Sequence, residues 1–412
     1  MIEGEIVVEI FVARQPIFDR QQDTCGYELL FRSGLANYFT HTDGDYASAK
    51  VVVNSFMELG LNALTGGRKA FINFTSSFLR SEYAMLFPAD SIVVELLENV
   101  TPDAPTVDAC RKLKSMGYTL ALDDFVYREG YEPFINLADI IKVDFMEFNA
   151  PNDRQAFVRK FGRSGIKLLA EKVETIEDFA QAEEMGYTYF QGYFFGKPKI
   201  VSGSEIAASK LGCLQILQEA NRTNLNFVRL EELVKHEVAI SYKLLKYINS
   251  ALFGLRWKIE SIKQALVLLG EKNVKKWISL VALAAMGDDK PAELLVHSVV
   301  RGRFCESISG QVGLRQRSQD LFFTGLFSLI DAIMEKPMPT ILAELAMAED
   351  VKAALLGESN KLRTVFDTAL AYEKGSWKQF AELSSHLKLN EEAVPGLYED
   401  AVKWANQVRE VA

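Results

Sequence analysis

Cysteine and histidine are scarce in this sequence. Its 412 residues include four cysteines and four histidines, and the cysteines stand singly, with no CxxC pair. Isolated cysteines of this kind are typical of free thiols in a reducing compartment, and they offer no zinc ligand set. The sequence therefore predicts neither a disulfide framework nor a zinc site.

Positive charge and long apolar runs are also limited. The chain has 46 Lys and Arg against 55 Asp and Glu, a net charge of −9, whereas general binders of the phosphate backbone carry a basic excess. We therefore expect no nucleic-acid partner. The apolar stretch 278–287 is about half as long as a membrane span, and the acidic N-terminus lacks the positive region of a signal peptide. We expect a cytoplasmic protein with no membrane segment.

Short β-rich runs alternate with helical stretches from about residue 7 to residue 199. This alternation indicates βαβ units and a mostly parallel sheet. Helices are predicted over residues 45–60, 101–117 and 175–186, each ending on a glycine. The eight predicted strands, enough to close a TIM-like (βα)8 barrel, cover residues 7–13, 27–32, 70–74, 92–96, 118–123, 139–144, 166–170 and 187–191.

The pattern changes after the Gly- and Ser-containing stretch 196–205. From Ile206 onward the sequence has long helical periodicity and no convincing strand. A chain of 412 residues is too long for one ordinary core. We therefore predict two domains, an α/β barrel over residues 1–199 and an all-α domain over residues 200–412.

Acidic and amide residues follow the apolar runs of the first domain. In a βα barrel, residues at the carboxyl ends of the strands converge on one mouth. Oxygen ligands of this type suit Mg²⁺ and Mn²⁺, and two such ions can clamp a phosphodiester. Lys142, inside an apolar strand, could orient water or stabilise developing charge. The candidate ligands are Glu28, Asn73, Glu95, Asp123, Asp124 and Glu171.

Structural interpretations of these residues stay open at this point. A single acid at a strand end is often a helix N-cap or a solvated loop residue. Lys142 lies two residues before Asp144, and the two could form a structural ion pair. Six polar residues at successive strands nevertheless favour a shared site.

Eight short motifs resemble, in order, those of the EAL domain, the phosphodiesterase family for the bacterial second messenger cyclic di-GMP. The resemblance covers about half of the chain, although the naming tripeptide departs, because Leu29 stands where the family has Ala. The motifs are RQPIFD (14–19), YELLFR (27–32), FINF (71–74), VVELLE (93–98), LALDDF (120–125), IIKVD (140–144), AEKVET (170–175) and FQGYFFGKP (190–198).

The resemblance implies a role for each matching residue. Glu28, Asn73, Glu95, Asp123 and Asp124 would be metal ligands for Mg²⁺ or Mn²⁺, and Gln191 would close the metal site. Lys142 and Glu171 would hold or activate the hydrolytic water. Gln15, Arg32 and Pro198 match positions that contact the nucleotide, and Glu98 and Glu174 match acids that order the neighbouring loop.

The loop after Asp124 departs from the family pattern. Active members continue with a Gly-Thr/Ser-Gly loop, whereas this chain has Val126, Tyr127 and Arg128 there. Glycines would allow backbone conformations with positive φ that Val126 and Tyr127 resist. We therefore expect weak or absent hydrolysis.

The helical half resembles the HDOD domain, a relative of the HD phosphohydrolases that typically lacks their metal-binding doublet. The motifs are residues 241–255, 261–270, 301–309 and 321–338. Ser328 and Leu329 stand in place of the His-Asp doublet, and His297 alone offers no ligand set, so no second hydrolase is expected. The four tryptophans need no cofactor to explain them.

Three functions remain after these resemblances. The leading interpretation is a signal transduction protein whose divergent EAL domain binds, and at most weakly hydrolyses, cyclic di-GMP, while its HDOD domain engages a protein partner. The alternative is an active metal-dependent phosphodiesterase producing pGpG under HDOD control. A third is an interaction scaffold without nucleotide binding. The protein partner, the metal preference and a homodimer are not decided by the sequence.

Overall fold

The computed structural model describes residues 10–33, 61–81, 83–145, 151–162, 165–194, 208–222, 224–249, 259 and 261–411. The chain divides into two compact units. The first comprises residues 1–194 together with 371–381, and the second comprises residues 195–370 and 382–412. The predicted boundary at 199/200 lies outside the described residues and stays a prediction.

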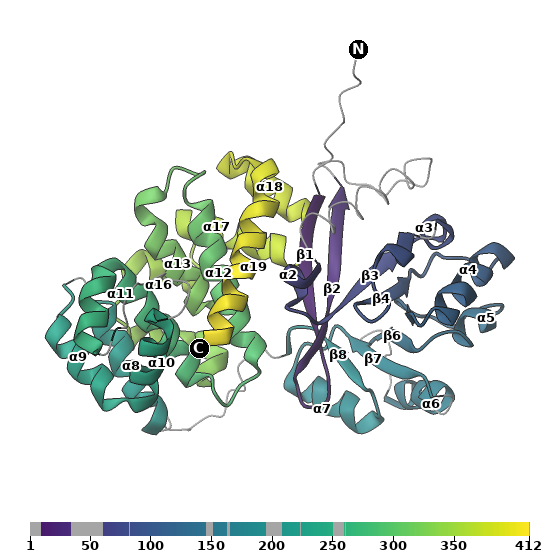
Figure 1. Cartoon of the computed structure of the whole chain (residues 1–412), viewed down its shortest axis with the longest axis horizontal. Coiled ribbons are helices and arrows are strands. Elements are labelled where there is room, and N and C mark those ends of the chain that lie inside the picture. Colours follow the sequence, from purple (N-terminus) through teal and green to yellow (C-terminus); the bar gives the residue numbers. More distant parts are fainter. Residues whose placement is uncertain are drawn as a thin grey trace, which may run out of the picture. The chain divides into compact units, whose positions relative to one another are not determined.

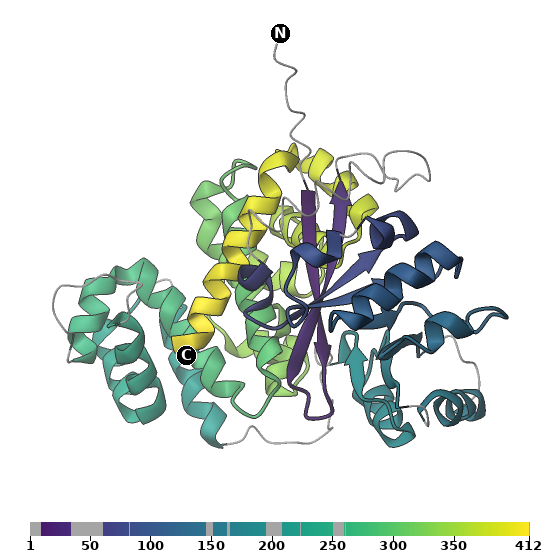
Figure 2. The same cartoon turned by 45° about the vertical axis from the view of Figure 1, so that its right-hand side comes forward.

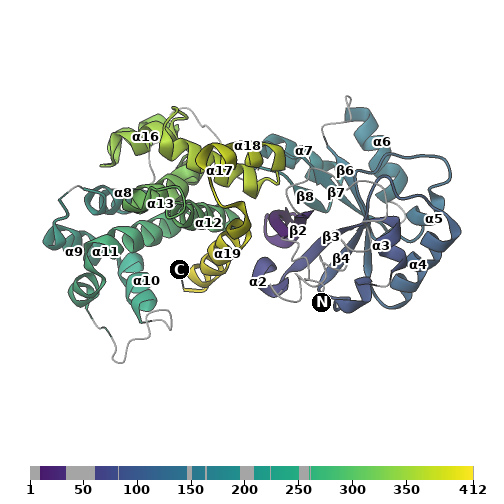
Figure 3. The same cartoon turned by 90° about the horizontal axis from the view of Figure 1, so that it is seen from above.

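The first unit is built on a closed barrel of eight strands in sequence order, which confirms the predicted fold class. Seven strands run parallel, and β1 lies antiparallel to both β2 and β8. Figure 3 looks onto this barrel, with its helices around the rim. The strands are β1 (Ile10–Phe18), β2 (Thr24–Ser33), β3 (Lys69–Phe74), β4 (Ile92–Leu96), β5 (Thr119–Leu122), β6 (Ile140–Asp144), β7 (Lys167–Glu171) and β8 (Tyr189–Gln191).

Strand β1 extends further than the sequence indicated. The predicted run ended at residue 13, whereas the strand continues to Phe18. Ile17 and Phe18 are both completely buried. They pair with β8 and close the barrel, so burial keeps this part of the chain extended.

The helices of the first unit begin and end where local signals place them. In α7 (Ile176–Met185), Thr175 and Asp178 form a reciprocal capping box, and Gly186 ends the helix at φ 104°. In α4 (Ala104–Ser115) the N-cap is Asp103. The predicted helix over 45–60 lies outside the described residues. The remaining helices are α2 (Leu61–Thr65), α3 (Ser76–Arg80), α5 (Glu132–Ile135) and α6 (Pro151–Phe161); Figure 1 labels them.

An apolar layer fills the barrel below its mouth. Six buried side chains from six strands pack together there: Ile17, Phe71, Val93, Ala121, Ile140 and Leu169. Side chains two residues apart on a strand point to the same face. The residues two positions nearer the carboxyl ends of the parallel strands must therefore also point inward, one layer higher. The sequence places polar residues at those positions.

The second unit is helical throughout its described residues, as predicted (Figure 2). The longest helix, α11, is kinked where Gly270 has φ 69°. None of the helices in the described ranges combines the length and hydropathy that a membrane crossing requires. The helices from residue 208 onward are α8 (Ala208–Ala220), α9 (Phe227–His236), α10 (Val238–Ile248), α11 (Ile262–Met286), α12 (Ala292–Ile308), α13 (Ser318–Leu326), α14 (Ile330–Met334), α15 (Met338–Glu344), α16 (Glu349–Leu355), α17 (Lys361–Glu373), α18 (Trp377–Leu387) and α19 (Val394–Val411), and the end of α17 and the start of α18 belong to the first unit.

Candidate functional site

Lys142 lies at the centre of a polar layer above the apolar one. It sits two residues beyond Ile140 on β6, and its side chain is completely buried. Its Nζ lies within ion-pair distance of four carboxylates. The distances are 3.1 Å to Glu28 Oε2, 2.9 Å to Glu95 Oε1, 2.6 Å to Asp123 Oδ1 and 3.1 Å to Glu171 Oε1. One ammonium therefore joins acids that are up to 143 positions apart in the sequence (171 − 28).

Glu28 is held by amides as well as by Lys142. Gln191 Nε2 donates to Glu28 Oε2 at 2.7 Å and lies 3.0 Å from Gln15 Oε1. Asn73 Nδ2 donates to Glu28 Oε1 at 3.3 Å. Gln15 and Glu28 are also register partners across β1 and β2. The network fixes the orientation of the Glu28 carboxylate.

The predicted site residues arrive at the mouth through strand alternation. Asn73, Glu95 and Glu171 follow Phe71, Val93 and Leu169 of the apolar layer by two positions, and Gln191 follows Tyr189. Gln15 precedes Ile17 because β1 runs in the opposite direction. The polar layer is therefore a direct consequence of the strand register.

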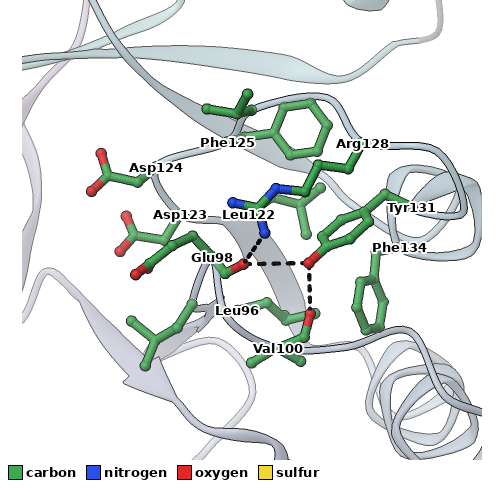
Figure 4. A pocket seen from close by; sticks show the side chains of 12 residues that line it. Leu96, Glu98, Val100, Leu122, Asp123, Asp124, Phe125, Arg128, Tyr131 and Phe134 are labelled. Atoms are coloured by element: carbon green, nitrogen blue, oxygen red, sulfur yellow. Dashed lines mark hydrogen bonds between the residues drawn. The ribbon is translucent and has the colours of Figure 1, made fainter.

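The two adjacent aspartates point differently, as expected for a pair beyond a strand end. Strand β5 ends at Leu122, and the Asp124 backbone turns through φ 40°. Asp123 contacts Lys142, whereas Asp124 is exposed. Figure 4 shows both carboxylates beside the loop that follows β5. Only Asp123 belongs to the Lys142 cluster in this structure.

Burial raises the pKa of three of these acids, because it removes water from the charged form. It places the pKa of Glu95 well above its usual value, that of Glu171 at about 8, and that of Asp123 above its usual value. Glu95 therefore lies against the Lys142 ammonium in surroundings that favour its protonated form.

Glu28 responds differently to the same surroundings. Burial also opposes its charge, but the Lys142 ammonium and the hydrogen bonds from Gln191, Lys142 and Asn73 outweigh burial and lower its pKa. Burial opposes the charge of Lys142 too, and its carboxylate neighbours raise its pKa well above the ordinary value. Glu28 and Lys142 are therefore the charged pair at the centre of the cluster.

Several oxygens of the cluster fit a divalent cation. The buried atoms without a well-formed hydrogen bond include Asn73 Oδ1, both carboxylate oxygens of Glu95, Glu171 Oε2 and Gln191 Oε1. Such oxygens are the ligands that Mg²⁺ and Mn²⁺ prefer. Within the described ranges, no three His, Cys, Asp or Glu side chains already stand in a metal-binding arrangement. The acids instead surround Lys142 Nζ. Their oxygen atoms are of the type that binds a divalent cation, but in this structure they are arranged around the Lys142 ammonium.

The other candidates lie at or outside the edge of this cluster. Glu98 and Glu174 are exposed. Arg32 is on β2, opposite Phe11, and the position of its side chain is outside the described part of the structure. Pro198 is likewise outside the described residues. The predicted alternative of a Lys142–Asp144 pair is wrong, because Asp144 binds Lys172 Nζ while Lys142 turns to the four acids.

Side chains of the loop after Asp124 form hydrogen bonds that hold the loop in place, and the sequence did not predict them. Tyr131 Oη lies 3.1 Å from the Val100 carbonyl and 3.3 Å from the Glu98 carbonyl, and Arg128 Nη1 lies 3.5 Å from the latter (Figure 4). Tyr127 Oη donates to Glu132 at 2.8 Å. The loop thus binds the backbone of the β4–α4 connection through Arg128 and Tyr131, and Gly130 supplies the positive φ of 91°. The Arg and two Tyr that follow the aspartates in the sequence could have indicated these bonds.

In the helical unit, the residues in place of an HD doublet have structural partners. Ser328 Oγ donates to the Gly325 carbonyl at 2.7 Å and lies 3.3 Å from Arg301 Nη1. His297 is buried, and its Nε2 lies 3.5 Å from Glu293 Oε1, one helical turn away.

The fold and site define a class: a closed βα barrel with an acid-lined mouth, joined to a helical domain. The EAL domain family matches residues 56–198, and the HDOD domain family matches residues 212–361. Cyclic di-GMP phosphodiesterase CdgJ of Vibrio cholerae is 34% identical over 403 residues, covering 97% of this chain and 93% of that protein. The chain belongs to the family of proteins that join an EAL domain to an HDOD domain.

Two further proteins are similar to this chain. The Bacillus subtilis protein YuxH, described as uncharacterized, is 33% identical over 409 residues, covering 97% of this chain and 99% of that protein. A solved structure of a standalone EAL protein from Vibrio cholerae O395, in a c-di-GMP bound form, is 24% identical with a TM-score of 0.37. It covers 46% of this chain and 92% of that chain.

Proposed function

We propose that the barrel binds cyclic di-GMP and hydrolyses it to linear pGpG with the help of Mg²⁺ or Mn²⁺. The observation that carries this proposal is the gathering of four carboxylates within 3.1 Å of Lys142 Nζ at the barrel mouth. A relative that aligns over 97% of this chain is named a cyclic di-GMP phosphodiesterase, which supports the substrate. In the reaction, water adds to one phosphorus and one phosphodiester bond opens.

Different side chains of the site would perform different parts of this reaction. Glu28, Asn73, Glu95, Asp123, Asp124 and Gln191 would hold the metal, which when bound supplies positive charge to the phosphate. Glu171 would accept a proton from water at Oε2, a buried oxygen with no hydrogen-bond partner in the described structure. Lys142 would keep the acids together and oppose the negative charge that develops on the phosphate. Gln15, Arg32 and Pro198 would contact the nucleotide, with Glu98 and Glu174 ordering the adjacent loops.

The direct test is turnover of cyclic di-GMP by Glu28→Ala and Glu28→Gln in the full chain. Both variants remove the charge that lies 3.1 Å from Lys142. We expect pGpG formation to be lost while circular dichroism and the melting profile stay those of a folded protein. Asp108→Ala is the matched control, because Asp108 is an exposed acid that pairs with Arg111 on α4. Wild-type turnover in the Glu28 variants would refute the proposal.

A second candidate is a cyclic di-GMP sensor with weak or no hydrolysis. The observation that favours it is the loop of residues 125–131, where Val126 and Tyr127 expose 52% and 46% of their surface in place of glycines. Calorimetry distinguishes the two functions. Binding of cyclic di-GMP without pGpG in either Mg²⁺ or Mn²⁺ would support the sensor, and absence of binding would support an interaction scaffold.

For the helical unit we propose a protein-binding role. Its surface exposes large apolar side chains, including Val228 at 67%, Tyr242 at 66% and Val267 at 70%. An apolar side chain left in water is stabilised when a partner surface covers it. A photo-crosslinking residue at position 242, compared with one at exposed Glu358, should capture a protein from the source cell specifically. Equal capture at both positions would contradict this role.

A further inference from the structure

Residues 371–381 belong to the barrel unit although they come from the C-terminal half of the chain. They lie beyond both matched regions, which end at residues 198 and 361. The segment includes the end of α17 and the start of α18. It is therefore a part of the first unit to which neither domain match assigns a role.

Aromatic side chains hold this segment on β1. The Phe11 ring centroid lies 6.3 Å from that of Tyr372, 6.2 Å from that of Trp377 and 6.1 Å from that of Phe380. Tyr372 and Phe380 are completely buried, and Phe11 is 2% exposed. Aromatic rings packed at such distances contribute both burial and a preferred geometry. The segment is thus packed as core.

Tyr372 also binds the backbone of β1. The Val12 N–H donates to Tyr372 Oη at 3.3 Å. Strand β1 pairs with β2 along residues 10–18, whereas it pairs with β8 at Ile17 and Phe18. The N-terminal part of β1 therefore has an edge facing away from β2 that needs other partners. Tyr372 supplies one of them.

The turn after α17 fixes where this hydroxyl sits. The N–H of Gly375 donates to the Tyr372 carbonyl at 2.9 Å, and that of Ser376 donates to the Ala371 carbonyl at 2.8 Å. These bonds are those of a Schellman motif, with Gly375 at φ 64°. A Cβ on Gly375 would lie 3.0 Å from Leu30 Cδ1 on β2. The turn therefore packs against Leu30 of β2, while Tyr372 accepts a hydrogen bond from Val12 of β1.

Both strands carry site residues a short distance from these contacts. Gln15 lies three residues after Val12 on β1, and Glu28 lies two residues before Leu30 on β2. Gln191 Nε2 donates to both residues, to Gln15 Oε1 at 3.0 Å and to Glu28 Oε2 at 2.7 Å. A shift of either strand would change the position of the Glu28 carboxylate. The contacts of residues 371–381 are thus linked to the site through two strands.

We propose that residues 371–381 are a positioning element of the nucleotide site, with Tyr372 as its central positioning residue. The inference rests on the proposed function, because the site it positions is the one assigned to cyclic di-GMP. Linkage is reciprocal, so cyclic di-GMP bound beside Gln15 would also stabilise the contact between Val12 and Tyr372. The C-terminal half of the chain thereby contributes directly to the barrel's affinity.

The test compares Tyr372→Phe with Tyr398→Phe in the full chain. Tyr398 is a buried tyrosine of the second unit, and its ring centroid lies 5.3 Å from that of Phe304. Two quantities are measured: hydrogen exchange of the residue 10–18 amides, and KM and kcat for cyclic di-GMP. We expect Tyr372→Phe to speed exchange at Val12 by roughly fivefold to thirtyfold, the range for one unpaired buried donor. KM should rise severalfold with a smaller change in kcat, and Tyr398→Phe should leave both quantities at wild-type values.

Wild-type exchange and wild-type KM in Tyr372→Phe would overturn the inference. If that variant does not fold, Gly375→Ala replaces it, because its Cβ disturbs Leu30 without removing the hydroxyl; a wild-type KM there would also overturn the inference. A wild-type protein that binds no cyclic di-GMP would instead refute the proposed function. In that case the exchange of residues 10–18 in Tyr372→Phe still decides whether the segment positions β1.

Discussion

Lys142 Nζ lies 2.9 Å from Glu95 Oε1, and both side chains are completely buried. A buried cation is costly unless acids surround it, and buried acids are equally costly without a cation. The four acids around Lys142 make this residue central to the stability of the cluster and to the proposed site. The first prediction concerns its removal.

Lys142→Met should destabilise the metal-free protein by about 3–5 kcal/mol, because it leaves buried acids without their cation. Urea denaturation measures this change. Lys114→Met is the control, since the Lys114–Asp139 pair is 30% and 38% exposed and should contribute less than about 1 kcal/mol. Equal effects of the two substitutions would contradict a structural role for the buried cluster.

Metal binding should release protons near neutral pH. Burial raises the pKa of Glu171 to about 8, so this acid holds a proton at pH 7, and burial also raises the pKa of Glu95 well above its usual value. A divalent cation bound beside these acids favours their ionised forms and displaces bound protons, which would leave Glu171 able to accept a proton from water. The affinity for Mg²⁺ should therefore rise as pH increases through about 8.

Calorimetry of Mg²⁺ binding at pH 7 in two buffers with different ionisation enthalpies measures the protons released. The observed heat should differ between the buffers. Asp108→Ala should leave that difference unchanged, because Asp108 is exposed and remote from the cluster. A heat that is the same in both buffers would mean that the acids bind metal without losing protons.

The loop after Asp124 should limit turnover. Replacing Val126 by Gly together with Tyr127→Thr restores the backbone freedom found in the family's Gly-Thr/Ser-Gly loop. We expect a severalfold increase in the rate of pGpG formation, measured by chromatography. The control Tyr127→Phe removes only the hydroxyl bonded to Glu132 and should not accelerate the reaction. An unchanged rate in the double variant would show that Arg128 and Tyr131 already hold the loop in a competent form.

The thiols should react slowly in the folded protein. All four cysteines are free, as predicted, and burial raises the pKa of Cys25 and of Cys110 to about 12. At pH 8 the reactive thiolate is then on the order of 0.01% of each group. Iodoacetamide labelling followed by mass spectrometry should modify Cys25 and Cys110 mainly after unfolding in urea. Fast labelling of Cys25 in the native protein would contradict this.

The barrel and most of its site could be predicted because their signals are local. Alternation along a strand and a glycine at a helix end are read within a few residues, as at Gly186 after α7. The same period of two that buries Val93 points Glu95 inward. The candidate ligands were therefore identifiable as a set before their positions were known.

The sequence by itself determined the two-domain architecture, the eight strands and the identity of the acids that follow them. Only the tertiary structure decided that Lys142 binds four of those acids, because each contact joins a different strand. It also decided that the Val12 N–H meets Tyr372, 360 residues away. Contacts across such separations depend on how whole elements pack, and no local propensity or period records them.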